Sequence, residues 1–223
     1  MVTCPEREAV RHQTLANLAK TDWDADIVVV VDEGTGNDRI ARIIATWHRA
    51  LVLGLATGAD LILALEDDLE FNRHLRTNLM SWSRLAGIDG ARPFFGSLYD
   101  PGHYAIHRRP EERYHLMDAN GCWGAQAFVM SAALVRFILH HWSEETAEPD
   151  IRMLRLASRL VPIYYHFPSL VDHVGVVSTW GGGPHRATGF APEWAAGAHP
   201  SYLEAHADRT SGFPEYRGVM PSR

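Results

Sequence analysis

The stretch "LILALEDDLEF", residues 61–71, joins an apolar run to three consecutive carboxylates. Its first five residues are all apolar, which is typical of a strand that is buried on both faces of a helix-covered sheet. Glu66, Asp67 and Asp68 would then lie at the carboxyl end of that strand, where ligands bind in open α/β sheets. Adjacent like charges are unfavourable unless a cation or hydrogen-bond donors offset them. The stretch therefore predicts either a divalent-metal site or a solvated acidic turn that caps the following helix.

Two strand-and-helix units precede this stretch. Residues 1–20 predict a short strand followed by a helix, and the apolar run 27–31 predicts a second strand that ends at Asp32. Apolar residues then recur at helical spacing between residues 40 and 55. This order is typical of the beginning of a parallel, nucleotide-binding sheet, in which Asp32 and Asp68 project from the same edge.

The segment after the acidic stretch predicts a helix, a strand and a long loop. The helix runs from Asn72 to about residue 85, and strand character resumes in "RPFFGSLYD", residues 92–100. The next segment is too long and too charged for a core element, so we expect a loop there. It contains His103, His107, Arg108, Arg109 and Arg113.

The second half of the chain predicts further strands and helices. Residues 125–130 predict a strand, and Ser131 after it is suited to cap a helix. Pro149 suits the first turn of the next helix, which places Asp150 at the positive end of that helix. Residues 161–175 predict the closing strands.

The composition fits a single domain. The chain has 223 residues, 46% of them hydrophobic, and a formal net charge of -6, which argues against a broad phosphate-binding surface. We expect one Rossmann-like α/β domain over residues 1–177, with a mostly parallel central sheet flanked by helices, and a loop-rich tail at 178–223 that covers the site. Cys4 and Cys122 lack CxxC spacing, and no apolar run is long enough to span a membrane. We therefore expect a cytoplasmic protein with free thiols.

The element order and the "EDD" triplet together resemble a glycosyltransferase of the GT-A fold. The segments "LALEDDLEF" and "PSLVDHVG" are similar to those of the N-acetylglucosaminyltransferase IV family, and the resemblance covers residues 2–175. "GAQAFVMS", followed by a helix and "PxD", is similar to related inverting enzymes. The resemblance implies an inverting, metal-dependent enzyme that moves a hexosyl or N-acetylhexosaminyl group from a nucleotide sugar, UDP-linked, to an acceptor hydroxyl.

The resemblance also implies a metal site. Asp68 corresponds to the carboxylate ligand, Asp67 assists through water, and Glu66 faces the sugar or ribose. His173 is the candidate second ligand, and its alternative role is that of a turn or core histidine bonded to the backbone. Imidazole beside carboxylate suits Mn²⁺ better than Mg²⁺, so Mn²⁺ is the expected cofactor.

The first-strand turn "TCPER" resembles the loop that receives the nucleotide base in this fold. Thr3, Pro5 and Arg7 are therefore candidate nucleotide-binding residues, although Arg7 is equally explained as a solvated surface charge. Asp32 is a candidate partner for uracil or ribose. Its alternative role is that of a turn or cap residue.

Asp150 is the candidate general base, because the positive end of a helix keeps a carboxylate ionised and its position matches the "PxD" of inverting relatives. A purely structural carboxylate would suit the same position. A helix that begins a few residues away would place another acid there. The competing acids are Glu144, Glu145 and Glu148.

The acceptor side is expected in "GCWGAQ", where Gly121 and Gly124 permit close approach and Trp123 offers a ring face. His185 and Arg186 either close onto the diphosphate or belong to a flexible tail. A glycan, a small molecule and a modified DNA base all remain compatible as acceptors. The alternatives are a nucleotidyltransferase, whose usual glycine-rich basic loop the chain lacks after the first strand, and a non-catalytic nucleotide-sugar-binding module.

Overall fold

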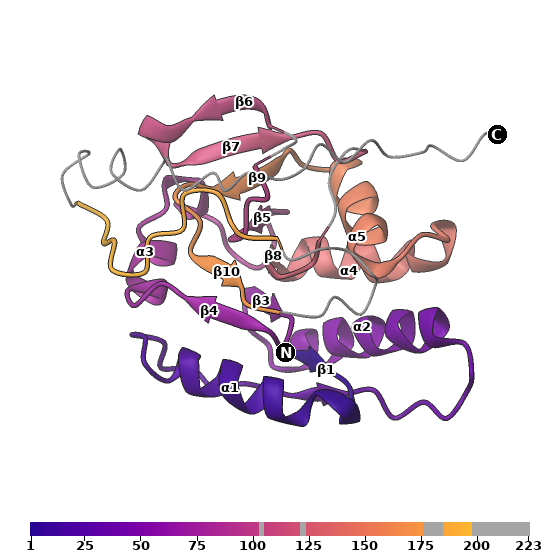
Figure 1. The fold of residues 1–223 in the computed structure, drawn as a ribbon. Helices are drawn as coiled ribbons and strands as arrows, with labels where there is room; N and C mark the ends of the chain where they lie inside the picture. Colours follow the sequence, from indigo (N-terminus) through magenta and orange to yellow (C-terminus); the bar gives the residue numbers. More distant parts are fainter. Residues whose placement is uncertain (103–104, 121–123, 176–184, 198–223) are drawn as a thin grey trace, which may run out of the picture.

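The structure is a computed structural model that describes residues 1–102, 105–120, 124–175 and 185–197 (Figure 1). It has mixed α/β architecture, as predicted, with helices on both faces of a central sheet. The strands are β1 (Val2–Thr3), β2 (Val30–Val31), β3 (Leu61–Leu65), β4 (Leu69–Phe71), β5 (Phe95–Ser97), β6 (Ala105–Arg109), β7 (Tyr114–Met117), β8 (Ala127–Ser131), β9 (Ile163–His166) and β10 (Val171–His173). The helices are α1 (Glu8–Leu18), α2 (Arg39–Ala56), α3 (Leu75–Met80), α4 (Ala132–His140) and α5 (Pro149–Ser158), and the short 3-10 turns are η1 (Pro5–Arg7), η2 (Ser83–Leu85), η3 (Pro110–Glu112) and η4 (Trp142–Glu144).

The central sheet has six strands in the order β3-β8-β5-β9-β7-β6. Among the pairings that the described residues make in this sheet, only β5 with β9 is parallel, and the others are antiparallel. The prediction of a mostly parallel sheet is therefore wrong. The reason is that β8 returns between β3 and β5 and pairs antiparallel with both of them.

Two smaller pairings flank the sheet. β1 and β2 are parallel neighbours, as the sequence predicts, and they form a two-stranded sheet of their own. β4 pairs antiparallel with β10, so that His173 lies opposite Leu69. This second pairing places β10 and its His173 beside the acidic stretch that follows β3.

The buried side chains form two clusters, one on each face of the sheet. The five residues of β8 are all buried and alternate between the clusters, with Phe128 and Met130 on one face and Ala127 and Val129 on the other. Helices α2, α4 and α5 cover the first face. Helices α1 and α3, together with the described segment 185–197, cover the second. A strand that is buried on both faces reads as a continuous apolar run, and this is how β3 and β8 appear in the sequence.

The segment predicted to be a polar loop is in part a hairpin. β6 pairs with β7 at one edge of the sheet, and four of the five residues of β6 are exposed. An exposed edge strand tolerates charged side chains, which also discourage pairing with other chains. Because the side chains of β6 are mostly charged or polar, the sequence pattern did not predict this strand. No helix in the described part of the chain is long and apolar enough to cross a membrane.

Candidate functional site

The acidic triplet lies at the carboxyl end of β3, as the sequence predicts. β3 ends at Leu65, and Glu66 follows it directly. Asp67 and Asp68 are buried, whereas Glu66 is half-buried. The triplet and Asp150 are termed the acidic cluster below, because the charge of Asp150 also acts on Glu66.

Thr3 at the end of β1 and Arg7 in the η1 turn after it bond to these carboxylates, and Arg7 offsets part of their charge. The Arg7 Nε donates to Asp67 Oδ1 at 2.8 Å, and Arg7 Nη2 donates to Asp68 Oδ2 at 2.6 Å. The hydroxyl of Thr3 donates to the other oxygen of Asp67 at 2.5 Å. Arg7, which the sequence alone could also explain as a solvated surface charge, is thus an ion-pair partner within the site.

Asp68 also contacts His173, since His173 Nε2 and Asp68 Oδ2 are 3.1 Å apart. Burial raises the pKa of the Asp68 carboxyl, but His173 and Arg7 outweigh it and hold the pKa below its usual value. For Asp67 the balance is reversed, because burial outweighs Thr3 and Arg7 and raises its pKa. The Asp68 Oδ1 atom is buried and has no hydrogen-bond partner among the described residues.

Glu66 carries the electrostatic cost of the cluster. Burial raises its pKa well above the ordinary value, and the charges of Asp68, Asp150 and Asp67 raise it further. The guanidinium of Arg7 acts in the opposite direction and does not offset these effects. The acidic cluster therefore keeps an excess of negative charge, which favours a positively charged ligand.

The metal prediction is wrong. In the part of the chain that the structure describes, no group of three or more His, Cys, Asp or Glu side chains is arranged to hold a metal ion. Asp68 and His173, the predicted ligands of Mn²⁺ or Mg²⁺, instead contact each other, and Arg7 binds the same oxygen of Asp68. A guanidinium supplies the positive charge that a metal was expected to supply.

Asp150 lies where the sequence places it. α5 begins at Pro149, so Asp150 is in its first turn, and the backbone N–H of Gly124 donates to Asp150 Oδ2 at 2.6 Å. Burial outweighs this bond and raises the pKa of Asp150. Among the competing acids, Glu144 and Glu145 form ion pairs with Arg159 at 2.6 and 2.8 Å, and Glu148 is the residue immediately before the helix.

The predicted acceptor loop is placed only in part. Gly121 and Trp123 lie outside the described residues. Gly124 has φ 92°, a left-handed conformation that favours glycine. Its contact with Asp150 joins this loop to the first turn of α5.

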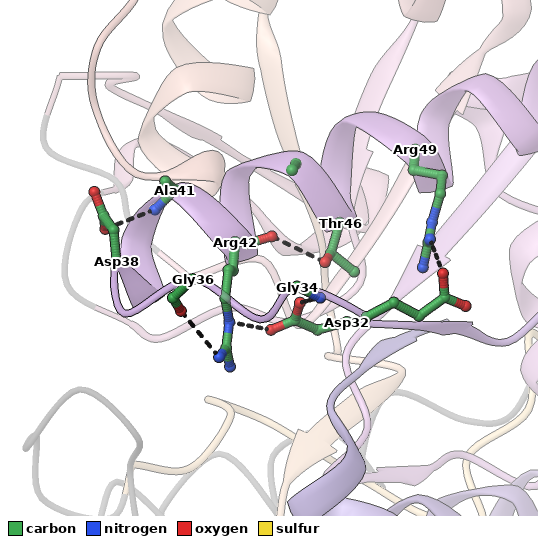
Figure 2. A pocket seen from close by; sticks show the side chains of 10 residues that line it. Asp32, Gly34, Gly36, Asp38, Ala41, Arg42, Thr46 and Arg49 are labelled. Carbon is green, nitrogen blue, oxygen red and sulfur yellow. Dashed lines mark hydrogen bonds and ion pairs between the residues drawn. The ribbon is translucent and has the colours of Figure 1, made fainter.

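A pocket of about 380 Å³ opens between the end of β2 and α2. Figure 2 shows Arg42 reaching from α2 to the carboxylate of Asp32, where Arg42 Nε and Asp32 Oδ2 are 2.9 Å apart. The other oxygen of Asp32 accepts from the Gly34 backbone at 2.9 Å. Asp32 therefore fills the turn role that the sequence offered as its alternative, and it lines the pocket as well. The backbone of Asp32 also bonds to Thr3, which links this pocket to the acidic cluster.

Tyr99 is a site residue that the sequence pattern did not reveal. Its hydroxyl lies 2.5 Å from His185 Nδ1, and the His185 ring stacks on His173 at 4.2 Å. Burial and the charges of Asp172 and Glu66 raise the pKa of Tyr99. The sequence placed Tyr99 within the predicted strand 92–100, whereas β5 ends at Ser97 and Tyr99 lies two residues beyond it. Only the sheet order shows that β5 runs in the same direction as β3.

The two tail residues singled out in the sequence are both at the site. Burial lowers the pKa of His185 to about 4, which keeps its ring neutral at physiological pH. Arg186 Nη1 donates to Asp172 Oδ2 at 2.8 Å. Pro5 opens the η1 turn that carries Arg7.

No family model matches the chain. The trans-aconitate 2-methyltransferase of Azoarcus sp. (strain BH72) is 24% identical to it in an alignment 213 residues long, and the match covers 85% of this chain and 79% of that protein. This similarity contradicts the resemblance to a GT-A glycosyltransferase of the N-acetylglucosaminyltransferase IV family. It also contradicts the predictions that depended on that resemblance: inverting glycosyl transfer, a UDP-linked nucleotide-sugar donor and a manganese cofactor.

Proposed function

We propose that the protein is a methyltransferase that takes its methyl group from S-adenosylmethionine. The observation that carries this proposal is the similarity along 85% of the chain to a protein named as a methyltransferase. S-adenosylmethionine supplies a reactive methyl group on a positively charged sulfonium.

The charge of the acidic cluster supports this donor. The cluster has four carboxylates, Glu66, Asp67, Asp68 and Asp150, and Arg7 pairs with only two of them. The buried Asp68 Oδ1, which has no partner among the described residues, is a further acceptor. A cationic ligand would lower the free energy of these carboxylates, because unpaired buried charge is costly.

The adenosyl part is assigned to the turn after β1 and to the neighbouring pocket. Thr3, Pro5 and Arg7 form one wall in this proposal, and Asp32 is the acceptor for ribose hydroxyls. The chain has no glycine before Gly34, so no glycine-rich loop follows β1. Binding must therefore depend on side chains of the η1 turn and of the Asp32 pocket more than on exposed backbone N–H groups.

Asp150 is proposed as the base that takes a proton from the acceptor, with Gly121, Trp123 and Gly124 on the acceptor side. Its raised pKa favours this role, because a stronger base is a better proton acceptor while it stays ionised. A base is needed only for a hydroxyl or amine acceptor, whose proton passes to Asp150 as the methyl group is transferred; trans-aconitate, the small organic acid in the relative's name, is already ionised at neutral pH and would attack the methyl group without a base. Asp150→Asn should therefore lower methyl transfer to a hydroxyl or amine acceptor by about a hundred- to ten-thousand-fold, leave transfer to trans-aconitate much less affected, and leave donor affinity unchanged. Turnover of a hydroxyl or amine acceptor within tenfold of the wild type would remove Asp150 from the reaction.

Direct binding tests the donor. Titration calorimetry should detect S-adenosylmethionine binding, about tenfold tighter than S-adenosylhomocysteine, because only the former carries the sulfonium charge that the carboxylates attract. Asp68→Asn should remove most of this preference. Asp26→Asn, at an exposed carboxylate, is the matched control. A folded wild-type protein that binds neither compound at millimolar concentration would rule out the proposed donor.

A further inference from the structure

A second pocket, of about 520 Å³, lies away from the acidic cluster and is called the distal pocket here. Its residues come from the η2 turn and from the segments that lead into β5 and β9. The residues that line it include Arg84, Arg92, Phe94, Leu160 and Tyr164.

The sheet order puts the distal pocket at the opposite edge from the acidic cluster. β3 and β5 are both antiparallel to β8, and β9 is parallel to β5, so β3, β5 and β9 run in one direction. The acidic triplet follows the end of β3, whereas Arg92 and Leu160 precede the starts of β5 and β9. The distal pocket is thus separate from the proposed methyl-transfer site and does not depend on it.

The charge of the distal pocket is the reverse of that of the acidic cluster. Its lining includes two arginines and no carboxylate. Arg92 is exposed, and within the described residues its guanidinium makes no ion pair or hydrogen bond. Positive charge with no carboxylate in the lining favours an anion.

Arg84 has contacts that fix its guanidinium group and a buried N–H donor that has no acceptor among the described residues. Its guanidinium lies 4.7 Å from the Tyr114 ring centre, and its Nη2 donates to Glu112 at 3.1 Å. The Arg84 Nε is buried and has no partner in the part of the chain that the structure describes. A buried charged donor without an acceptor is costly, and an oxygen atom of a ligand would supply that acceptor.

Apart from Ser83, the remaining lining residues of the distal pocket are aliphatic or aromatic. The rings of Phe94 and Tyr164 are stacked, with centres 6.1 Å apart and planes 10° apart. The Leu160 side chain beside them is 48% exposed. Phe94 itself is only 3% exposed, so a flat apolar group would remove mainly the surfaces of Leu160 and Tyr164 from water.

We propose that the distal pocket binds a small organic anion that joins a carboxylate or phosphate group to a flat apolar body. The anionic group lies between Arg84 and Arg92, and the apolar body lies against Tyr164 and Leu160. The volume is in the range that small-molecule sites occupy in proteins.

Benzoate and its neutral counterpart benzamide test this proposal on the full chain. Titrations followed by amide NMR should show benzoate shifting the signals of Ile88, Leu160 and Tyr164, with at least tenfold weaker binding of benzamide. Phenyl phosphate serves as a second probe. Tighter binding of phenyl phosphate would identify a phosphate ester as the ligand class, and tighter binding of benzoate would identify a carboxylate.

Two variants locate the anion. Arg92→Gln should weaken benzoate binding about tenfold, and Arg84→Lys, which keeps the charge but removes the Nε donor, should weaken it several-fold. Arg76→Gln makes the same change of net charge on α3, outside the lining residues, and should have no effect. Equal binding of benzoate and benzamide, or unchanged benzoate affinity in folded Arg92→Gln protein, would overturn the proposal.

Discussion

Arg7 shows why an acidic triplet on its own does not define a metal site. The chain places a guanidinium against Asp67 and Asp68, at 2.8 and 2.6 Å, in the position where a divalent ion was expected. Ion pairing of this kind favours the charged form of both partners, but it does not extend to Glu66. Burial also raises the pKa values of Asp67 and Asp150, but the pKa of Glu66 is the one raised well above its ordinary value.

Glu66→Gln should stabilise the protein at alkaline pH. The folded state raises the pKa of Glu66 well above its ordinary 4.5, so the native protein binds a proton that the unfolded chain releases between those two values. Stability is then lost as the pH rises through this window, and glutamine avoids the loss. We expect a gain that grows as the pH rises above 4.5 and almost none at pH 4, measured by urea unfolding.

The control is Asp26→Asn, which removes an exposed carboxylate that, among the described residues, makes no hydrogen bond or ion pair with the acidic cluster. It should change the stability little at either pH. If Glu66 also attracts a cationic donor, the stabilised Glu66→Gln protein should bind S-adenosylmethionine more weakly, a common trade between stability and function. A Glu66→Gln protein that is equally or less stable at pH 8 would show that the carboxylate is not strained.

At the scale of elements, the sequence predicted best where burial and periodicity agree. β3 has the predicted bounds, 61–65, because both of its faces are covered and its ends are marked by polar residues. α2 spans 39–56, close to the predicted 40–55, because its apolar stripe is strong. Ser131 caps α4 as predicted, and its Oγ accepts from Leu134.

Strand direction was not predictable, because periodicity is the same for a parallel and an antiparallel neighbour. β8 reads as a buried strand in either case, and only its pairing with β3 and β5 makes the sheet mixed. β4 was missed for a different reason. Its three residues alternate buried, exposed, buried, and such a short run after charged residues carries little signal.

The same limits applied to the candidate site. Asp32 and the acidic triplet were predicted at one edge, because the ends of successive strands are visible in the sequence, whereas Thr3 and Arg7 were proposed there only from a resemblance. The contact of Arg7 with the triplet, which replaces the predicted metal, depends on a guanidinium 60 residues away in the chain from Asp67. Pairing over such a separation is set by the tertiary fold, and no local pattern encodes it.

At the scale of the whole molecule, the described segment 185–197 connects two parts of the second face of the sheet. One end of the segment bonds to α3, and the other end bonds to Asp100 after β5. In Figure 1 it runs beside α3, drawn toward the yellow end of the colour scale. Asn78 is buried at the centre of this contact: it donates to Trp194 O and Asn72 Oδ1, both at 2.8 Å, and accepts from Ala196 N at 2.7 Å. At its other end, Thr188 N donates to Asp100 O at 2.7 Å. The segment also carries His185, so its attachment determines whether the contact with Tyr99 persists.

Asn78→Ala should release this segment as a unit. The variant loses three hydrogen bonds and leaves the Ala196 N–H without its acceptor, at a cost of about 2–3 kcal/mol. Native-state hydrogen exchange should become faster at Ala196 and also at Thr188, which Asn78 does not contact, because a cooperative segment opens along its whole length. Amides of the β3–β8 pair should exchange as in the wild type, and Asn120→Ala, at an exposed asparagine, should change neither group. Faster exchange at Ala196 with an unchanged rate at Thr188 would mean that the two ends are attached independently and that Asn78 has no influence on His185.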